Sequence, residues 1–311
     1  MAKKNDFALG IACCIIAAVL WGSTGVAGQY LINGRGVDNT WLTTFRTFVG
    51  GGLLVLWTII TKKGAAFDIW RNKHDAIHLV IYGAIGVAAC YWTYLEAVSL
   101  SNAPTATVLQ YLSPIIIVVY MAVRNRKMPS VQELVGVVCA VTGVFAMATH
   151  FDFGSLSISP AALVIGITSA FCLAFYGVYP KDLIRKYGAV YVYGWAVFVG
   201  GIVMMFVRPL WQVPTEAFAT MDLPLAAVLA FVLFFGTMFA YSIYLVGVDK
   251  IGPSRGSMIS SIEPVATAFL AAVLLSTPLE LLDWVGVGLI TVTVIVLSIP
   301  SKADREAQTA E

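Results

Sequence analysis

Hydrophobic residues gather in ten long stretches of this chain, and short polar segments separate one stretch from the next. A helix needs roughly 20 mainly apolar residues to cross the hydrocarbon core of a bilayer. The strands of a membrane barrel are shorter, about ten residues of alternating polarity, so the pattern indicates helices. The predicted spans cover residues 8–32, 39–61, 76–98, 102–123, 131–149, 160–180, 188–208, 225–248, 254–276 and 283–299.

The first stretch begins like a secretion signal, because Lys3 and Lys4 precede apolar residues that start at about Phe7. The apolar run continues to Ile32, which is too long for the hydrophobic part of a cleaved signal peptide. We therefore interpret it as the first retained span.

Basic residues alternate with the spans in a way that predicts the orientation of the chain. With the N-terminus placed inside, 16 of the 19 Lys and Arg residues fall on the inner side, two on the outer side, and Arg46 within a span. Segments rich in Lys and Arg stay in the cytoplasm, so both termini are predicted to be cytoplasmic, in the inner membrane of a bacterium. Three tryptophans fall at the predicted outer edge, as an interfacial aromatic belt requires: Trp41, Trp211 and Trp284.

The composition fits a membrane protein. Hydrophobic residues make up 59% of the 311 residues and charged residues 12%, whereas about 25% of the residues of a soluble domain are charged. The net charge of +2 indicates no nucleic-acid partner, and the lipid bilayer is the expected surrounding. The cysteines all lie in apolar runs, where thiols act as small hydrophobic groups, so we expect no disulfides among Cys13, Cys14, Cys90, Cys139 and Cys172.

Several kinds of chemistry have no support in the sequence. His74 and His78 share a helical face, but no cluster of cysteines or carboxylates joins them in a metal site. The sequence has no glycine-rich loop followed by Lys-Ser or Lys-Thr that would hold ATP, and no nucleophile or base constellation faces one leaflet. The sequence therefore implies no cofactor, no metal and no enzymatic activity, and it leaves monomer and homodimer open.

The two halves of the chain resemble each other at an interval of 150 residues. Between residues 91 and 144, 11 of 54 positions are identical to the residue 150 positions later. Apolar composition inflates such matches, so the matched prolines and glycines weigh most. The matched pairs include Tyr91 and Tyr241, Tyr94 and Tyr244, Leu95 and Leu245, Pro114 and Pro264, and Gly136 and Gly286.

Each repeat contains five predicted spans, and because five is odd, the second repeat must enter the membrane upside down. We therefore predict an all-α integral membrane protein with ten transmembrane helices in two inverted five-helix repeats, residues 1–150 and 151–300. Residues 301–311 form a short cytoplasmic tail. Inverted repeats that meet at a site near the bilayer midplane are typical of secondary transporters, so the pattern indicates transport.

Pro114 and Pro264 lie near the middle of the fourth and ninth predicted spans. At a rise of about 1.5 Å per residue, both are close to the centre of a bilayer about 30 Å thick. A proline leaves the carbonyl four residues earlier without its helical partner, and these carbonyls belong to Gln110 and Ser260. The prolines either shape packing alone or act as hinges that expose polar backbone to a cavity, and their symmetric placement favours hinges.

Glu263 is an ionisable residue near the predicted midplane. Such a residue costs at least about 2.5 kcal/mol on insertion scales, so it normally faces a cavity or a partner. It is either a structural glutamate or a group that binds a proton or a cationic cargo. Helical spacing predicts two stripes that form the floor of a substrate site: Gly256, Ser260, Glu263 and Thr267, and Ala106, Gln110, Ser113 and Ile117.

Arg46 lies about two turns inside the outer edge of the second span, and Glu96 lies close to the outer end of the third. The two residues either pair as an external gate or substrate clamp, or extend their charged ends to the outer interface. Both interpretations are equally supported for Arg46, and the interface is favoured for Glu96.

Trp21 is central in the first span, and the small residues of Gly22-Ser23-Thr24-Gly25 follow it. Small residues allow helices to approach closely. The indole ring either stacks on a bound ligand or fills a gap in the core, and we favour the ligand. The corresponding region of the second repeat contributes Tyr176 as a second aromatic candidate.

These features resemble the EamA family of the drug/metabolite transporter superfamily over nearly the whole chain. The residues that carry the resemblance are the Trp21-Gly22-Ser23-Thr24 segment, Arg46, the small-residue runs before Pro114 and Pro264, and Gly136 and Gly286. The family often has a glutamate nine residues before each of these glycines, whereas this chain has Lys127 and Thr277, so no role of that glutamate is carried over. The resemblance implies a basket-shaped fold in which spans 1, 3, 4, 6, 8 and 9 surround a central cavity, and it implies export, often of amino acids or related metabolites.

The leading hypothesis is therefore a secondary transporter that exports amino acids or similar small metabolites by alternating access, either driven by protons or facilitative. One alternative is a transporter of lipophilic or quaternary cations, which Glu263 and the aromatic residues suit. Another is a transporter of sugar nucleotides, whose anionic groups would require a Lys or Arg at the midplane, where none is predicted. A membrane enzyme or sensor is the remote alternative.

Overall fold

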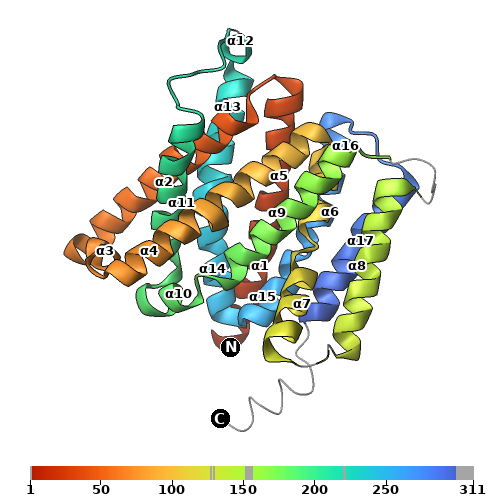
Figure 1. Ribbon diagram of the computed structural model, residues 1–311, viewed down its shortest axis with the longest axis horizontal. Helices are drawn as coiled ribbons and strands as arrows, with labels where there is room; N and C mark the ends of the chain where they lie inside the picture. Colours follow the sequence, from red (N-terminus) through yellow and green to blue (C-terminus); the bar gives the residue numbers. More distant parts are fainter. Residues whose placement is uncertain (1, 127, 129, 151–156, 220–221, 299–311) are drawn as a thin grey trace.

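The computed structural model describes residues 2–126, 128, 130–150, 157–219 and 222–298, which form a bundle of long helices (Figure 1). No strand occurs among these residues. The helices of the first half are α1 (Ala2–Gln29), α2 (Asn39–Lys62), α3 (Asp68–Arg71), α4 (Lys73–Ile81), α5 (Ala89–Leu100), α6 (Ala103–Gln110), α7 (Ser113–Asn125) and α8 (Val131–Thr149). Those of the second half are α9 (Pro160–Val178), α10 (Lys181–Tyr187), α11 (Ala189–Val207), α12 (Thr215–Phe218), α13 (Leu223–Phe231), α14 (Ala240–Ile251), α15 (Pro253–Ser260), α16 (Ile262–Leu275) and α17 (Leu281–Ser298).

Eight helical stretches within the described residues are long and apolar enough to cross a membrane. They cover Asp6–Gly34, Asn39–Arg71, Lys73–Leu100, Ala103–Arg124, Val131–Thr149, Pro160–Tyr187, Ala189–Val207 and Leu223–Ile251. The last two predicted spans correspond to shorter apolar helices, Ile262–Leu275 and Leu281–Leu297. The chain is thus an all-helical, multi-pass membrane protein. The ten-span layout in two inverted repeats stays a prediction, and the predicted tail, residues 301–311, lies outside the described residues.

Two of the predicted spans are broken near their centres. The fourth consists of α6 and α7, which separate at Tyr111, and the ninth consists of α15 and α16, which separate at Ser261. Positions 111 and 261 differ by the repeat interval of 150 residues. Pro114 and Pro264 lie in the first turn of α7 and α16, where backbone N–H groups have no helical acceptor. The prolines therefore begin separate half-helices instead of bending continuous ones.

Two other helices widen into π-helical segments at equivalent positions. The segment η3 (Tyr82–Ala88) joins α4 to α5, and the segment η4 (Val232–Phe239) joins α13 to α14. Their first residues are again 150 positions apart. A short π-helical segment inside an α-helix often marks a functional site.

The helices α2 and α11 pack side by side through a reciprocal pair of glycine contacts (Figure 1). A Cβ atom on Gly51 would lie 2.4 Å from the backbone nitrogen of Phe198, and one on Gly201 would lie 2.4 Å from that of Phe48. Only glycine fits such distances. A shift of 150 residues converts each contact into the other, which is the reciprocity that a two-fold relation between the two halves produces.

The helices α8 and α17 form a second pair of neighbours, again through glycines. A Cβ atom on Gly286 would lie 2.8 Å from the carbonyl oxygen of Gly143. The pair related by 150 residues is also in contact, because Thr293 Oγ1 donates to the Gly136 carbonyl at 3.2 Å. The matched glycines Gly136 and Gly286 thus occupy the same interface.

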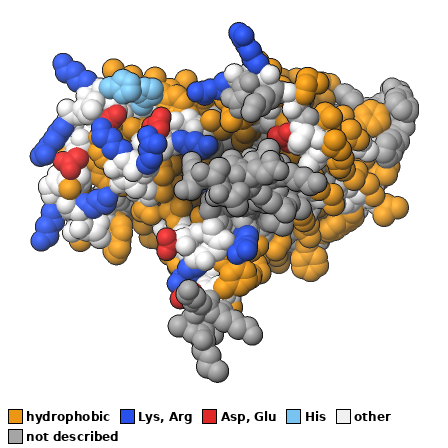
Figure 2. Space-filling model, turned by 90° about the horizontal axis from the view of Figure 1, so that it is seen from below, with side chains coloured by type: hydrophobic (Ala, Val, Ile, Leu, Met, Phe, Trp, Pro, Cys, Tyr) orange, Lys and Arg blue, Asp and Glu red, His pale blue; other side chains and the backbone are white. Residues whose placement is uncertain are grey.

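The face that carries the N-terminus is rich in Lys and Arg on the side formed by α3, α4 and α10 (Figure 2). The side chains of Arg71, Arg185 and Lys186 are 76%, 85% and 52% exposed there. Lys186 pairs with Asp75, which also accepts a hydrogen bond from Tyr187 at 2.7 Å. We call this the basic face. The distribution of Lys and Arg in the sequence places this face in the cytoplasm, and that location stays a prediction.

Candidate functional site

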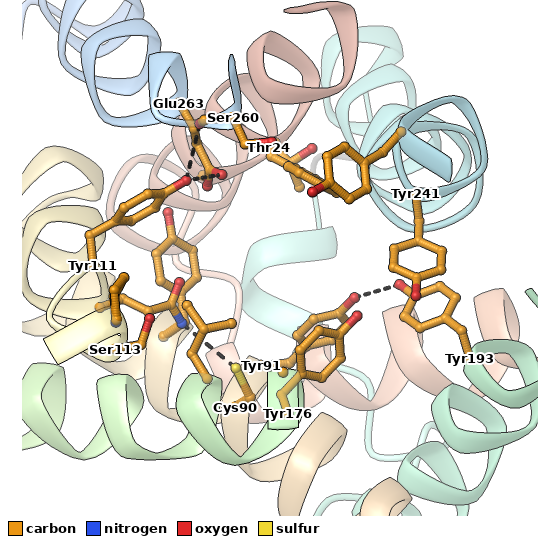
Figure 3. Close-up of a pocket in the computed structure, with 18 of the residues that line it drawn as sticks. Thr24, Cys90, Tyr91, Tyr111, Ser113, Tyr176, Tyr193, Tyr241, Ser260 and Glu263 are labelled. Atoms are coloured by element: carbon orange, nitrogen blue, oxygen red, sulfur yellow. Dashed lines mark hydrogen bonds between the residues drawn. The ribbon is translucent and has the colours of Figure 1, made fainter. Parts of the chain in front are cut away.

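A cavity of about 510 Å³ lies between helices of both halves of the chain (Figure 3). This volume is in the range of small-molecule binding sites, which often form between the helices of a bundle. The lining includes one carboxylate, one guanidinium and a large aromatic surface. The cavity therefore combines apolar contact area with a few charged and polar groups.

The cavity collects all seven residues that the sequence predicts for a substrate site: Glu263, Ser260, Gln110, Ser113, Trp21, Tyr176 and Arg46. Of the two predicted hinges, Pro114 lines the cavity and Pro264 is buried. The structure thus brings residues that are far apart in the sequence together in the lining of one cavity. What they bind stays a prediction.

The Glu263 carboxylate lies at the break between α15 and α16, opposite the break between α6 and α7 (Figure 3). Tyr111 Oη donates to Glu263 Oε2 at 2.7 Å and also contacts the Ser260 carbonyl oxygen at 3.3 Å. This carbonyl is one of the two that a proline four residues later leaves without a helical partner. The two broken helices therefore meet through one tyrosine side chain.

The helix α1 comes very close to α16 beside Glu263. A Cβ atom on Gly22 would lie 2.9 Å from Thr267 Oγ1 and 3.2 Å from the carbonyl oxygen of Glu263. Ser260 and Glu263 line the cavity, whereas Thr267 is buried against α1. The predicted stripe is therefore divided within α16, where Glu263 lines the cavity and Thr267, one turn later, packs against α1.

Arg46 is buried, with 6% of its surface exposed, and it lines the cavity. Its Nε donates to Thr237 Oγ1 at 2.9 Å and its Nη2 to the Gly236 carbonyl at 3.3 Å, both in η4. The guanidinium carbon lies 4.5 Å from the centre of the Tyr91 ring, within the range of a cation–π interaction. The burial of Arg46 contradicts the interpretation that its charged end extends to the outer interface.

Arg46 and Glu96 do not form the predicted gate or clamp. Glu96 accepts a hydrogen bond from the side-chain amide of Asn39, whereas Arg46 is held by η4 of the other half of the chain. The π-helical segment η4 provides the hydrogen-bond acceptors that a buried guanidinium requires. The sequence around Arg46 in α2 does not show that a distant helix supplies these acceptors.

The sequence prediction missed most of the tyrosines that line the cavity. Tyr193 and Tyr241 stack with 3.9 Å between ring centroids, and the hydroxyls of Tyr91 and Tyr193 share a hydrogen bond at 2.7 Å (Figure 3). Tyr94 and Tyr244 also line the cavity. The repeat aligns Tyr91 with Tyr241 and Tyr94 with Tyr244. Because a buried tyrosine hydroxyl needs a polar partner, matched tyrosines in apolar spans are the signal that could have located them.

Two of the predicted residues have well-defined neighbours. The Trp21 ring lies 5.1 Å from the Tyr244 ring, so it is part of the aromatic surface. Gln110 Nε2 donates to Ser169 Oγ at 2.7 Å and also contacts Cys90 Sγ at 3.7 Å. Gln110 thus ties α6 to α9, whereas Trp21 provides an apolar face to the cavity.

The charges do not follow the internal repeat. Arg46 aligns with Ala196, and Glu263 aligns with Ser113. Each half of the chain therefore supplies one charge of the cavity. Glu263 and the Tyr91 ring, over which Arg46 lies, occupy opposite sides of the cavity (Figure 3). The cavity is bipolar, although the helices around it repeat.

The cavity extends toward the basic face, and a buried glutamine ties helices together at the opposite end of the bundle. Pro180 and Ile184, at α10, belong to its lining. At the far end of α1, Gln29 Nε2 donates to Thr277 Oγ1 at 2.9 Å, and Gln29 Oε1 accepts from the Ala103 N–H at 2.8 Å. Gln29 is buried. It connects α1 to the start of α6 and to the segment that follows α16.

A bundle of membrane-spanning helices around a cavity of small-molecule size, with a few charged and polar groups in an apolar lining, is typical of a membrane transporter. The EamA-like transporter family matches residues 8–149 and matches again over residues 160–299. The chain belongs to this family, and it is a membrane transporter of the drug/metabolite transporter type.

Named relatives agree with this class. The chain is 37% identical over 300 residues to the uncharacterized inner membrane transporter YicL of Salmonella typhimurium, covering 96% of this chain and 98% of that protein. It is 23% identical over 286 residues to an uncharacterized transporter of Archaeoglobus fulgidus, covering 91% and 96% of the two chains. A solved structure described as "Crystal structure of protein" aligns with a TM-score of 0.61 over 96% of this chain and 98% of that chain, at 16% identity. That similarity shows the shared fold.

Proposed function

We propose that the protein is a secondary transporter that exports amino acids or similar small zwitterionic metabolites across a bacterial inner membrane by alternating access. The observation that carries this proposal is that a carboxylate, Glu263, and a guanidinium, Arg46, line the same cavity. An ammonium group would bind at Glu263 and a carboxylate at Arg46, through charge-assisted hydrogen bonds. The tyrosines and Trp21 would contact the remainder of the cargo.

Alternating access would arise from movement of one inverted repeat, residues 1–150, against the other, residues 151–300. The reciprocal contacts of α2 with α11 and of α8 with α17 support such a two-fold relation. Pro114 and Pro264, beside the two helix breaks, are the proposed hinges. Opening toward the outer side requires α6 and α16 to part at the end where Gln29 now joins them.

The test is counterflow in proteoliposomes that contain the purified protein. The radiolabelled probes are L-phenylalanine, L-threonine, L-lysine, putrescine and tetraphenylphosphonium, each with and without a pH gradient. We expect exchange of at least one amino acid. A Glu263→Gln variant should insert normally and lose accumulation, and concentrative transport by this variant at the rate of the unmodified protein would exclude Glu263 from the mechanism.

The second candidate cargo is a lipophilic or quaternary cation. The aromatic surface beside Glu263 favours it, because aromatic faces attract quaternary ammonium groups. The charge of Arg46 is partly covered by the Tyr91 ring. An Arg46→Gln variant separates the two candidates, since it should abolish amino-acid exchange and leave tetraphenylphosphonium exchange in place.

A further inference from the structure

Tyr111 is the side chain that joins the two helix breaks at the cavity. It occupies the break between α6 and α7 in the first half of the chain. Its hydroxyl donates to Glu263 Oε2 at 2.7 Å, on the first turn of α16 in the second half. The residue aligned with Tyr111 in the second half is Ser261. At these two aligned positions, only the first half therefore contributes a tyrosine side chain that reaches the other half.

This hydrogen bond holds the carboxylate in one orientation. A glutamate side chain has several rotatable bonds, and ordering such a side chain on binding costs affinity. With Oε2 held by Tyr111, the carboxylate is already fixed before an ammonium group arrives. Tyr111 thus pre-organises the Glu263 carboxylate for binding.

The orientation depends on the conformation of the protein, because donor and acceptor belong to different halves. In the present conformation the cavity extends toward the basic face, and the Gln29 contacts join α1, α6 and the segment after α16 at the other end of the bundle. If the halves move to open the other end, the breaks that carry Tyr111 and Glu263 shift relative to each other. Tyr111 then no longer fixes the carboxylate.

On the basis of the proposed function, we propose that Tyr111 is a positioning residue that raises the affinity of the site for cationic or zwitterionic cargo on the side of the basic face. It does so by orienting Glu263 across the contact between the two halves. The cargo binds Glu263, and Tyr111 acts through Glu263.

The experiment compares half-saturation concentrations on the two sides of the membrane. Tyr111→Phe keeps the ring and removes the hydroxyl, and the probes are L-phenylalanine, L-lysine and tetraphenylphosphonium in right-side-out and everted vesicles. For each probe that the unmodified protein moves, Tyr111→Phe should raise the half-saturation concentration about two- to tenfold on the side of the basic face. The maximal rate, and the half-saturation concentration on the other side, should stay within about twofold.

Tyr191→Phe is the matched control. It removes another buried hydroxyl, which donates to the Ala66 carbonyl at 2.8 Å and does not line the cavity. Its half-saturation concentrations should match those of the unmodified protein on both sides. An equal change on both sides in Tyr111→Phe, or no change on either, overturns the assignment while leaving the transporter function intact.

A double-mutant cycle on melting temperature in detergent tests the contact without any cargo. Because the two side chains are hydrogen-bonded, the effects of Tyr111→Phe and Glu263→Leu on the melting temperature should not be additive, and strict additivity contradicts the positioning role. If the unmodified protein moves none of the probes, the proposed function fails, and the positioning role fails with it.

Discussion

The side-chain amide of Gln29 donates to the hydroxyl of Thr277 at 2.9 Å, across 248 positions of sequence. The same side chain accepts a hydrogen bond from the N–H of Ala103, which begins α6. Gln29 therefore fastens three helices at the end of the bundle away from the basic face.

Replacing Gln29 by alanine should weaken this connection between the helices. The change leaves a buried backbone N–H unpaired, which costs about 1–3 kcal/mol, so Gln29→Ala should melt at a lower temperature in detergent. Thr277→Val removes one of the two bonds and should show a smaller decrease. Equal melting temperatures for Gln29→Ala and the unmodified protein would show that the contact contributes nothing to stability.

The reciprocal glycine contacts between α2 and α11 predict matched effects in the two halves. Gly51→Ala and Gly201→Ala each place a methyl group 2.4 Å from a backbone nitrogen, and overpacking of this kind costs about 1–3 kcal/mol. Both variants should lower the melting temperature by similar amounts. Gly288→Ala meets no atom within 4 Å and serves as the control with no loss. A large effect from only one of the two glycines would contradict the two-fold relation.

Arg46→Lys should impair transport although it keeps the charge. A lysine lacks the planar fork that reaches Thr237 and Gly236 together, and a hydrogen bond of a charged group contributes about 1.5–3 kcal/mol. We therefore expect initial counterflow rates for amino acids to fall about tenfold or more. Arg208→Lys, near Asp38 and outside the cavity, is the control that should transport normally. Normal rates in Arg46→Lys would mean that the fork geometry is not needed.

The ion pair of Arg35 with Asp222 predicts how stability depends on pH. Arg35 Nη1 lies 2.9 Å from Asp222 Oδ2, and this hydrogen bond lowers the pKa of the Asp222 carboxyl. Because the folded pKa lies below the unfolded value of about 3.9, the contribution is present above about pH 4 and is lost as pH falls through the folded value. Between neutral pH and pH 3, the melting temperature of Asp222→Asn should decrease less than that of the unmodified protein. If the melting temperature of Asp222→Asn decreases as much as that of the unmodified protein, this ion pair does not contribute to the pH dependence of stability.

The sequence predicted much of the helical layout because long apolar stretches have few alternatives in a bilayer. The first predicted span ends at residue 32 and the candidate span ends at Gly34, and the third, residues 76–98, corresponds to Lys73–Leu100. The sequence also located Pro114 and Pro264 as special positions. It did not show that the helices break completely before them, because a proline alone is compatible with a bend or with a new helix start.

The cavity was harder to predict than the helices. Glu263 stood out because a carboxylate in an apolar span needs an explanation. Tyr111 and Tyr193 did not, since a tyrosine in such a span is also a common packing residue. The place of Arg46 depends on Thr237 in the π-helical segment η4, and that local widening of a distant helix has no recognised pattern in the sequence.

The unequal distribution of charge over a repeated scaffold has a consequence for mirror-image molecules. An α-amino acid would bind Glu263 with its ammonium group and Arg46 with its carboxylate. With these two groups fixed, the side chain of one enantiomer points toward the aromatic surface around Trp21, and that of the other points away from it. Three distinct contacts are enough to tell the two enantiomers apart. The proposed carrier is therefore expected to be stereoselective.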